Sequence, residues 1–426
     1  MEQTISLQPR WSQGSLIAFR FFFVYFILYI LPFPLIYFPY STVLLQALSD
    51  VTLSVINGIS IPFFGRPITH VINGSGDTTF EYARLYLFLC LASFATIGWS
   101  ILDRKSNAYE KLWYWLTILL RYYLAAVMIG YGMAKIFKTQ FPFPYYNLNQ
   151  TYGESSPMGL LWNFMGYSTA YNIFIGLGET LGGFLLFFKR TRLLGALVLF
   201  GVMSNVVMLN FTYDVPVKLF SSHLLALIVL LIAPDIKRLF KLFVLNEPIE
   251  CEPTKSVYSN EKMRSFYMIG KGILILYILI YSTMLNLKNL RQLKENYVSM
   301  QAAQPLSGEF EVETFLINDA IIPLDSLPTR RWKTFRIEGG KANTQFMDGA
   351  SMSWMFHRNI HNSIMLISPD LTTTAKFTFH ADGPILTIEG MLYQDTIKVV
   401  SRRIKDSEFL LVDRKFHWVN EFPYNK

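Results

Sequence analysis

Before residue 305 the chain alternates long apolar stretches with short polar links, and this pattern predicts membrane helices. Seven stretches approach or exceed the roughly 20 residues that an α-helix needs to cross a bilayer, and they cover residues 16–38, 82–102, 112–137, 169–188, 193–209, 217–236 and 266–285. A further segment, near 43–55, has the character of a helix that lies on the membrane surface. The pattern therefore predicts a polytopic membrane protein.

Residues 305–426 follow a different pattern. The run 309–316 alternates apolar or β-branched residues with glutamates, which is the period of two of a half-buried strand. The inward set is Phe310, Val312, Thr314 and Leu316, and the outward set is Glu309, Glu311 and Glu313. Similar runs occur at 351–357, 363–368, 375–380, 385–390, 396–402 and 408–412. About eight short antiparallel strands favour a small barrel or a sandwich. The fold class is thus mixed, with an α-helical membrane bundle followed by an all-β domain.

The predicted organisation has five parts along the chain. The first two membrane helices and an outer loop occupy 1–111, a four-helix membrane bundle 112–236, a polar link 237–265, the seventh helix with a charged stem 266–304, and the β-rich domain 305–426.

Composition and charge support this division. Hydrophobic residues make up 52% of the chain and charged residues only 16%, against roughly 25% charged residues in soluble domains. The net charge of +8 arises before residue 305, where Lys and Arg gather in the short links between helices. Such clustering is typical of membrane topology signals and excludes a nucleic-acid-binding face.

The distribution of Lys and Arg also predicts an orientation. The links after the second, fourth and sixth helices hold twelve of these residues, whereas the links after the first, third and fifth hold two. Because basic links stay in the cytoplasm, the N-terminus is expected inside and the β-domain outside. The only cysteines are Cys90 and Cys251, so neither a disulfide framework nor a metal site is expected.

Polar residues interrupt the four apolar stretches between 112 and 236. Ionisable groups inside a bilayer are costly and usually face a bundle interior or a cavity. The residues in question are Arg121, Lys135, Glu179, Asn205, Asp214, Lys218 and His223. Any chemistry is expected among them.

Helical spacing predicts which way some of these residues point. Asn172, Gly176, Glu179 and Gly183 recur at steps of four, three and four, so they share one face. Small residues let a neighbouring helix approach closely, and we therefore expect this face to point into the bundle.

These positions lead to the hypothesis of one polar pocket that opens outward. Glu179, Lys218 and His223 are its candidate catalytic residues, although His223 joins only if its helix begins irregularly. The candidate ligand-binding residues are Lys135, Asn205, Asp214 and Arg121. The alternative is purely structural: Lys135 with Glu179, and Asp214 with Lys218, would be ion pairs that hold helices together.

The stretch 121–235 resembles the DoxX-like family of small four-helix membrane proteins. The resemblance rests on Arg121, on a G-x-x-K ending the first helix at Lys135, on E-x-x-G-G from Glu179 to Gly183, and on the basic hairpin 189–192. It implies a compact four-helix bundle in the bacterial inner membrane.

Some DoxX-like relatives are associated with quinone-linked oxidation of sulfur compounds. The resemblance thus implies a quinone-headgroup site, with Lys135 and His223 as hydrogen-bond donors and Glu179 as proton acceptor. An electron-transfer partner would then be another protein. Two alternatives remain open: a carboxylase-like membrane enzyme, with Lys and His at the interface, and a membrane anchor whose β-domain binds an envelope partner.

Overall fold

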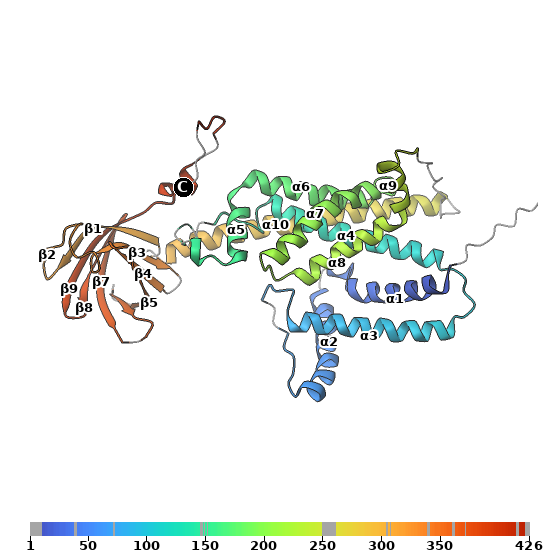
Figure 1. Ribbon diagram of the computed structural model, residues 1–426, viewed down its shortest axis with the longest axis horizontal. Coiled ribbons are helices and arrows are strands. Elements are labelled where there is room, and N and C mark those ends of the chain that lie inside the picture. The colour runs from blue at the N-terminus through green and yellow to red at the C-terminus, as the bar shows by residue number, and fades with distance from the viewer. Residues whose placement is uncertain are drawn as a thin grey trace, which may run out of the picture. The chain divides into compact units, whose positions relative to one another are not determined.

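The computed structural model describes residues 11–37, 41–70, 73–144, 148, 150, 152–248, 261–303, 306, 308–338, 341–359, 363–370, 372–414 and 417–421. The chain divides into two compact units (Figure 1). The helical unit comprises Met1–Phe143 and Ser155–Leu290, and the barrel unit comprises Pro144–Glu154 and Arg291–Lys426.

The helical elements follow the predicted order. They are α1 (Gln13–Ile30), α2 (Ser41–Phe64), α3 (Thr79–Leu102), α4 (Glu110–Ile136), α5 (Pro157–Tyr167), α6 (Thr169–Leu186), α7 (Arg192–Thr212), α8 (Lys218–Ile232), α9 (Ile236–Phe243) and α10 (Glu261–Ala303), with short 3₁₀ turns at Leu35–Tyr37, Tyr152–Glu154 and Ala233–Asp235. Side-chain caps begin several of them: the Ser12, Thr78, Ser156 and Ser168 hydroxyls each accept a backbone N–H of the first turn.

Seven of the described helical segments are long and apolar enough to cross a membrane, which is consistent with a multi-pass membrane protein. This set of seven differs from the predicted set, because it includes α2 and leaves out α6. Glycines, Asn172 and Glu179 lower the hydropathy of α6. Figure 1 shows α2 running across the direction of α1 and α3, and most α2 side chains are exposed.

A buried arginine joins the first helices. Arg20 of α1 is only 4% exposed, and it donates to the Tyr109 hydroxyl at 3.0 Å, to Ser100 Oγ at 2.9 Å and to the Asp103 carbonyl at 2.8 Å. It therefore ties α1 to the link between α3 and α4. Charge-assisted hydrogen bonds are among the stronger ones inside a protein, and they account for a cation within this apolar unit.

The C-terminal unit contains a closed eight-stranded antiparallel β-barrel, which resolves the choice between barrel and sandwich. Its strands are β1 (Gly308–Ile317), β3 (Trp332–Glu338), β4 (Lys341–Phe346), β5 (Ser351–Asn359), β6 (Ser363–Ile367), β7 (Thr374–Asp382), β8 (Ile385–Leu392) and β9 (Asp395–Arg403), while β2 (Ala320–Ile321) extends β1 as a hairpin. Neighbours in sequence pair in order, and β1 pairs with β9 to close the barrel.

Side chains fill the barrel interior. Trp332, Trp354, Phe315, Phe335 and Phe377 are each at most 2% exposed, as expected for an eight-stranded barrel, whose interior is about wide enough for side chains alone. The Trp354 indole donates to Thr344 Oγ1 at 3.1 Å, so the buried N–H is satisfied. This core holds the barrel without a disulfide.

The β-domain differs from the prediction in several details, and the strands β3 and β4 were not predicted. The segment predicted as a strand at 408–412 begins in a 3₁₀ turn, Asp406–Glu408, and continues as the short helix α11 (Leu410–Asp413). In β1 the register shifts between Val312 and Thr314. A bulge of this kind adds one residue to a strand and reverses the faces beyond it, which is why Phe315 lies inside rather than Leu316.

Candidate functional site

The helices around the candidate site approach one another through glycine. A Cβ atom on Gly132 of α4 would lie 2.6 Å from the Gly176 carbonyl oxygen of α6, and one on Gly183 would lie 3.0 Å from the Ala125 carbonyl oxygen. On the other side of α6, a Cβ on Gly195 of α7 would lie 2.8 Å from the Gly182 carbonyl oxygen. Backbone contacts this close require residues without a side chain.

The predicted inward face of α6 is confirmed. Asn172, Gly176, Glu179 and Gly183 are all buried, and Glu179 is 1% exposed. Asn172 donates to the Met165 and Ser168 carbonyls and thereby fixes the start of α6 against α5. The glycine contacts bring this face directly against α4.

Lys135 of α4 and Glu179 of α6 form a buried ion pair. Lys135 Nζ lies 2.9 Å from Glu179 Oε1 and 2.8 Å from Oε2, and the two side chains are 7% and 2% exposed. The Nζ atom also lies 5.6 Å from the ring centre of Tyr131 and 6.0 Å from that of Phe141. The ammonium group is thus held between a carboxylate and two aromatic rings.

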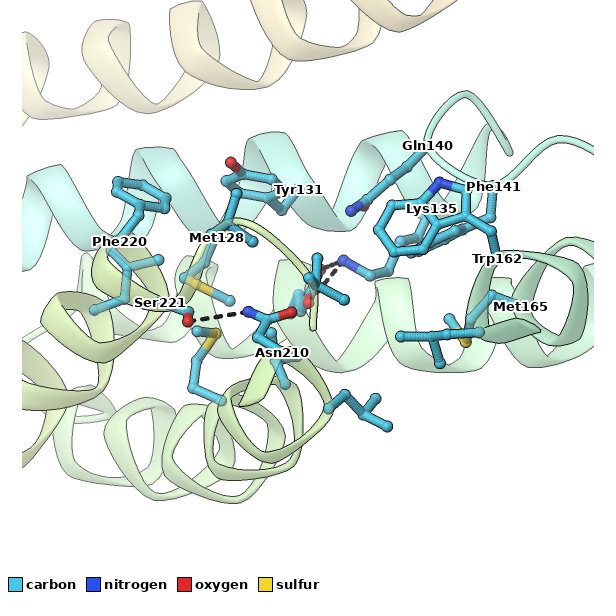
Figure 2. Close-up of a pocket in the computed structure, with 18 residues that line it drawn as sticks. Met128, Tyr131, Lys135, Gln140, Phe141, Trp162, Met165, Asn210, Phe220 and Ser221 are labelled. Carbon is cyan, nitrogen blue, oxygen red and sulfur yellow. Dashed lines mark hydrogen bonds and ion pairs between the residues drawn. The ribbon is translucent and has the colours of Figure 1, made fainter. Parts of the chain in front are cut away.

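A cavity of about 100 Å³ adjoins the ion pair (Figure 2). Its polar lining consists of Lys135, Glu179, Asn210 and Ser221, together with the side chain of Gln140. The Gln140 Oε1 atom is buried and has no hydrogen-bond partner among the described residues. The apolar lining comes from α4, α5, α7 and α8, from the loop after α4 and from the residues before α8: Met128, Phe141, Leu161, Trp162, Met165, Met203, Val206, Leu209, Val215, Val217, Phe220 and Leu224, with Tyr131.

Asn210 contributes to this cavity, although the sequence analysis did not select it. Its amide nitrogen donates to Ser221 Oγ at 3.0 Å, and that hydroxyl donates to the Lys218 carbonyl at 3.1 Å. Figure 2 shows the Asn210 amide oxygen turned toward the ion pair. The helical spacing of Asn210 from the buried Leu199 and Met203 could have revealed its inward position.

Asn205 lies elsewhere. It shares a face of α7 with Gly201 and Met208, as predicted, but that face is exposed. Asn205 lines a groove of about 900 Å³ between α6 and α7, and Lys135 also lines this groove. Asn205 therefore does not line the cavity beside Glu179, because the buried stripe of α7 runs through other residues.

Asp214 and Lys218 form a separate cluster at the start of α8. Lys218 Nζ lies 2.7 Å from Asp214 Oδ1 and 3.8 Å from Asp77 Oδ2. The Asp77 carboxylate also accepts the backbone N–H groups of Lys218 and Leu219, each at 2.9 Å. A carboxylate at a helix N-terminus is stabilising, so this cluster fixes α8 and does not line the ion-pair cavity.

His223 points away from the ion pair and toward α1. Its Nδ1 atom lies 2.7 Å from the Leu219 carbonyl, and its Nε2 atom lies 2.6 Å from the Tyr25 hydroxyl. Tyr29 stacks on the imidazole with ring centres 4.3 Å apart. A proton on Nδ1 satisfies the carbonyl, which leaves Nε2 to accept from Tyr25. The helix begins regularly, so His223 does not join the pocket.

Arg121 lies at the far end of the α4–α6 contact. Its guanidinium donates to the Leu186 carbonyl at 3.0 Å from Nε and 2.6 Å from Nη2. Cations favour helix C-termini, where carbonyls lack partners. Arg121 therefore caps the end of α6, and the single predicted pocket is reduced to Lys135 and Glu179 with Asn210, Ser221 and Gln140.

The geometry limits what this site can do. An ammonium group has three N–H donors, and two of those of Lys135 are directed at the Glu179 carboxylate. One donor remains for a hydrogen-bond acceptor, and Glu179 can accept a proton. The pair is neutral as a whole, so it suits a neutral polar group better than a second anion.

The comparison with known proteins gives one relative to report. The chain is similar to a protein of Bacillus subtilis strain 168 called "Uncharacterized protein YwoB", with 32% identity over 130 residues that cover 30% of this chain and 82% of that protein. No known family profile matches the chain, and no solved structure matches it.

Proposed function

Since the chain belongs to the same family as YwoB of Bacillus subtilis, we propose that it is a bacterial inner-membrane protein of DoxX-like type that binds the polar head of a quinone or another lipid. The binding site is the buried pair of Lys135 and Glu179. The protein would serve as a redox-associated subunit, with electrons exchanged through a protein partner. Lys218 and His223 do not line the cavity and have no part in the proposal.

The observation that carries the proposal is the empty volume beside the ion pair. Protein interiors are normally close-packed, and a cavity of about 100 Å³ is large enough to hold part of a bound molecule. A pair that served only to join α4 to α6 would need no such space. The unpartnered Gln140 Oε1 at its wall and the remaining Lys135 donor supply groups for a bound polar head.

Mass spectrometry of lipids and small molecules extracted from the purified protein tests this proposal. We expect the wild type to retain a quinone or lipid that the double variant Lys135→Met/Glu179→Leu has lost. The matched control is Lys218→Ala, which removes a cation 3.8 Å or less from two carboxylates but lies outside the cavity, and it should retain the molecule. Equal amounts of the bound molecule in all three proteins would show that the ion pair has only a structural role.

We further propose that the N-terminus faces the cytoplasm and that the barrel is periplasmic. Basic residues in the links after α3, α6 and α8 support this orientation. In a background without Cys90 and Cys251, a membrane-impermeant maleimide should label Tyr393→Cys on the barrel, where this side chain is 63% exposed, in intact spheroplasts. Lys189→Cys in the α6–α7 link should react only after permeabilisation. The reverse labelling pattern would show that the protein has the opposite orientation.

A further inference from the structure

The groove between α6 and α7 lies on the exposed surface of the helical unit. Phe174, Leu177 and Leu181 of α6 are 73%, 53% and 54% exposed, and Met208 of α7 is 61% exposed. These apolar side chains are typical of a surface that faces lipid. The groove passes over Gly178 and Gly201 and has a volume of about 900 Å³.

The groove leads to the ion pair. Lys135, Met165, Val206 and Leu209 line both the groove and the cavity, so Lys135 stands at their junction. The hydroxyl of Thr180, which also lines the groove, is buried and has no hydrogen-bond partner among the described residues. The groove and the cavity therefore adjoin each other at Lys135.

The two volumes constrain the shape of a ligand. An apolar cavity of about 150 Å³ holds a benzene ring, and the cavity beside Glu179 measures about 100 Å³. It accepts a carbonyl group or the edge of a ring, but not a whole ring. The rest of a ligand would lie in the groove, whose volume of about 900 Å³ has room for an alkyl or prenyl tail.

Resting on the proposed function, we infer that a neutral lipid-soluble carbonyl compound with one long tail enters sideways from the bilayer between α6 and α7. Its carbonyl oxygen accepts a hydrogen bond from Lys135, and its tail lies in the groove over Gly201. Neutrality follows from the balanced charge of Lys135 and Glu179, because an anion would leave a net negative charge buried. A prenylated ring or a neutral glyceride ester shares this chemistry, and the mass of the extracted molecule distinguishes them.

Filling the groove tests the inference. A Cβ atom on Gly201 would meet no atom within 4 Å, so Gly201→Trp places an indole in the groove without a backbone clash. The control is Gly98→Trp on α3, where a Cβ is equally free. The probes are a benzoquinone with a ten-carbon tail and the same ring without it, titrated calorimetrically into nanodiscs that hold the protein, with empty nanodiscs as the blank.

We expect Gly201→Trp to weaken binding of the tailed probe about tenfold or more, equivalent to about 1.4 kcal/mol, and to leave the tail-less probe unchanged. Gly98→Trp should change neither. An unchanged affinity for the tailed probe, or an equal loss of both probes, would overturn the inference. Lys135→Met/Glu179→Leu could retain the tailed probe while Gly201→Trp loses it. That result would support tail binding in the groove and refute headgroup binding at the ion pair.

Discussion

Glu179→Gln is expected to lower the free energy of unfolding by about 3–5 kcal/mol, because it leaves the Lys135 ammonium buried without its counter-charge. Lys135 is 5% exposed, so bulk solvent does not reach its ammonium group. Lys135→Met alone should have an effect of similar size. Unfolding by denaturant in mixed micelles, followed by circular dichroism, measures both changes.

The double variant separates stability from binding. Replacing both partners of a buried ion pair by apolar residues is often neutral or stabilising, so Lys135→Met/Glu179→Leu should recover most of the stability lost in either single variant. The surface control is Lys241→Gln, which breaks an ion pair whose side chains are 57% and 51% exposed and should change stability by less than about 1 kcal/mol. A double variant no more stable than the single variants would contradict this account.

Gly132→Ala is expected to destabilise the protein by about 1–3 kcal/mol, the usual range for overpacking. The new methyl group would lie 2.2 Å from Thr180 Oγ1 and 2.6 Å from the Gly176 carbonyl oxygen. The hydroxyl can rotate away, whereas the backbone oxygen moves only if α4 and α6 separate. The same denaturation assay detects the loss, and the separation should also reduce the amount of co-purified ligand.

Gly130→Ala is the matched control for this substitution. It lies on the same helix two residues away, and a Cβ atom there would meet no atom within 4 Å. Alanine favours helix over glycine by about 1 kcal/mol in soluble hosts, so stability should stay unchanged or rise slightly. Equal destabilisation by the two substitutions would show that the loss in Gly132→Ala does not come from the contact between α4 and α6.

The sequence predicted α6 well because several signals agree there. Its glycines, Asn172 and Glu179 share one face, and the cost of burying ionisable groups in lipid turns that face inward. The same argument failed for Asn205, since an amide is less costly at a groove than a charge is in lipid. The inward residue of α7 is Asn210, which the sequence marked only by its spacing from Met203.

Long-range partners limited the prediction of the site. Nothing local to His223 indicates that its partners are Tyr25 and Tyr29 on α1, and nothing local to Lys218 indicates Asp77. These contacts depend on how separate helices pack, which helical periodicity does not encode. The ion pair could be predicted because Lys135 and Glu179 are the charges nearest the glycine contact.

The prediction of the barrel strands from the sequence was limited in a similar way. The strand β4 was missed because its inward residues, Ala342 and Thr344, are small or polar, so its sequence lacks an alternating apolar signal. Thr344 belongs inside because it accepts the hydrogen bond of Trp354. The strand β7 was found because Ala375, Phe377 and Phe379 alternate with exposed residues, as a half-buried strand requires.

The pairing of β1 with β9 has a consequence for how the chain is made. These are the first and the last strands of the barrel, so the ring can close only after nearly the whole polypeptide has left the ribosome. Until then the growing sheet keeps two open edges, which invite pairing with other chains. Contacts between such distant segments also form slowly. The long helix α10 precedes β1 in the chain, so it is made before any strand of the barrel.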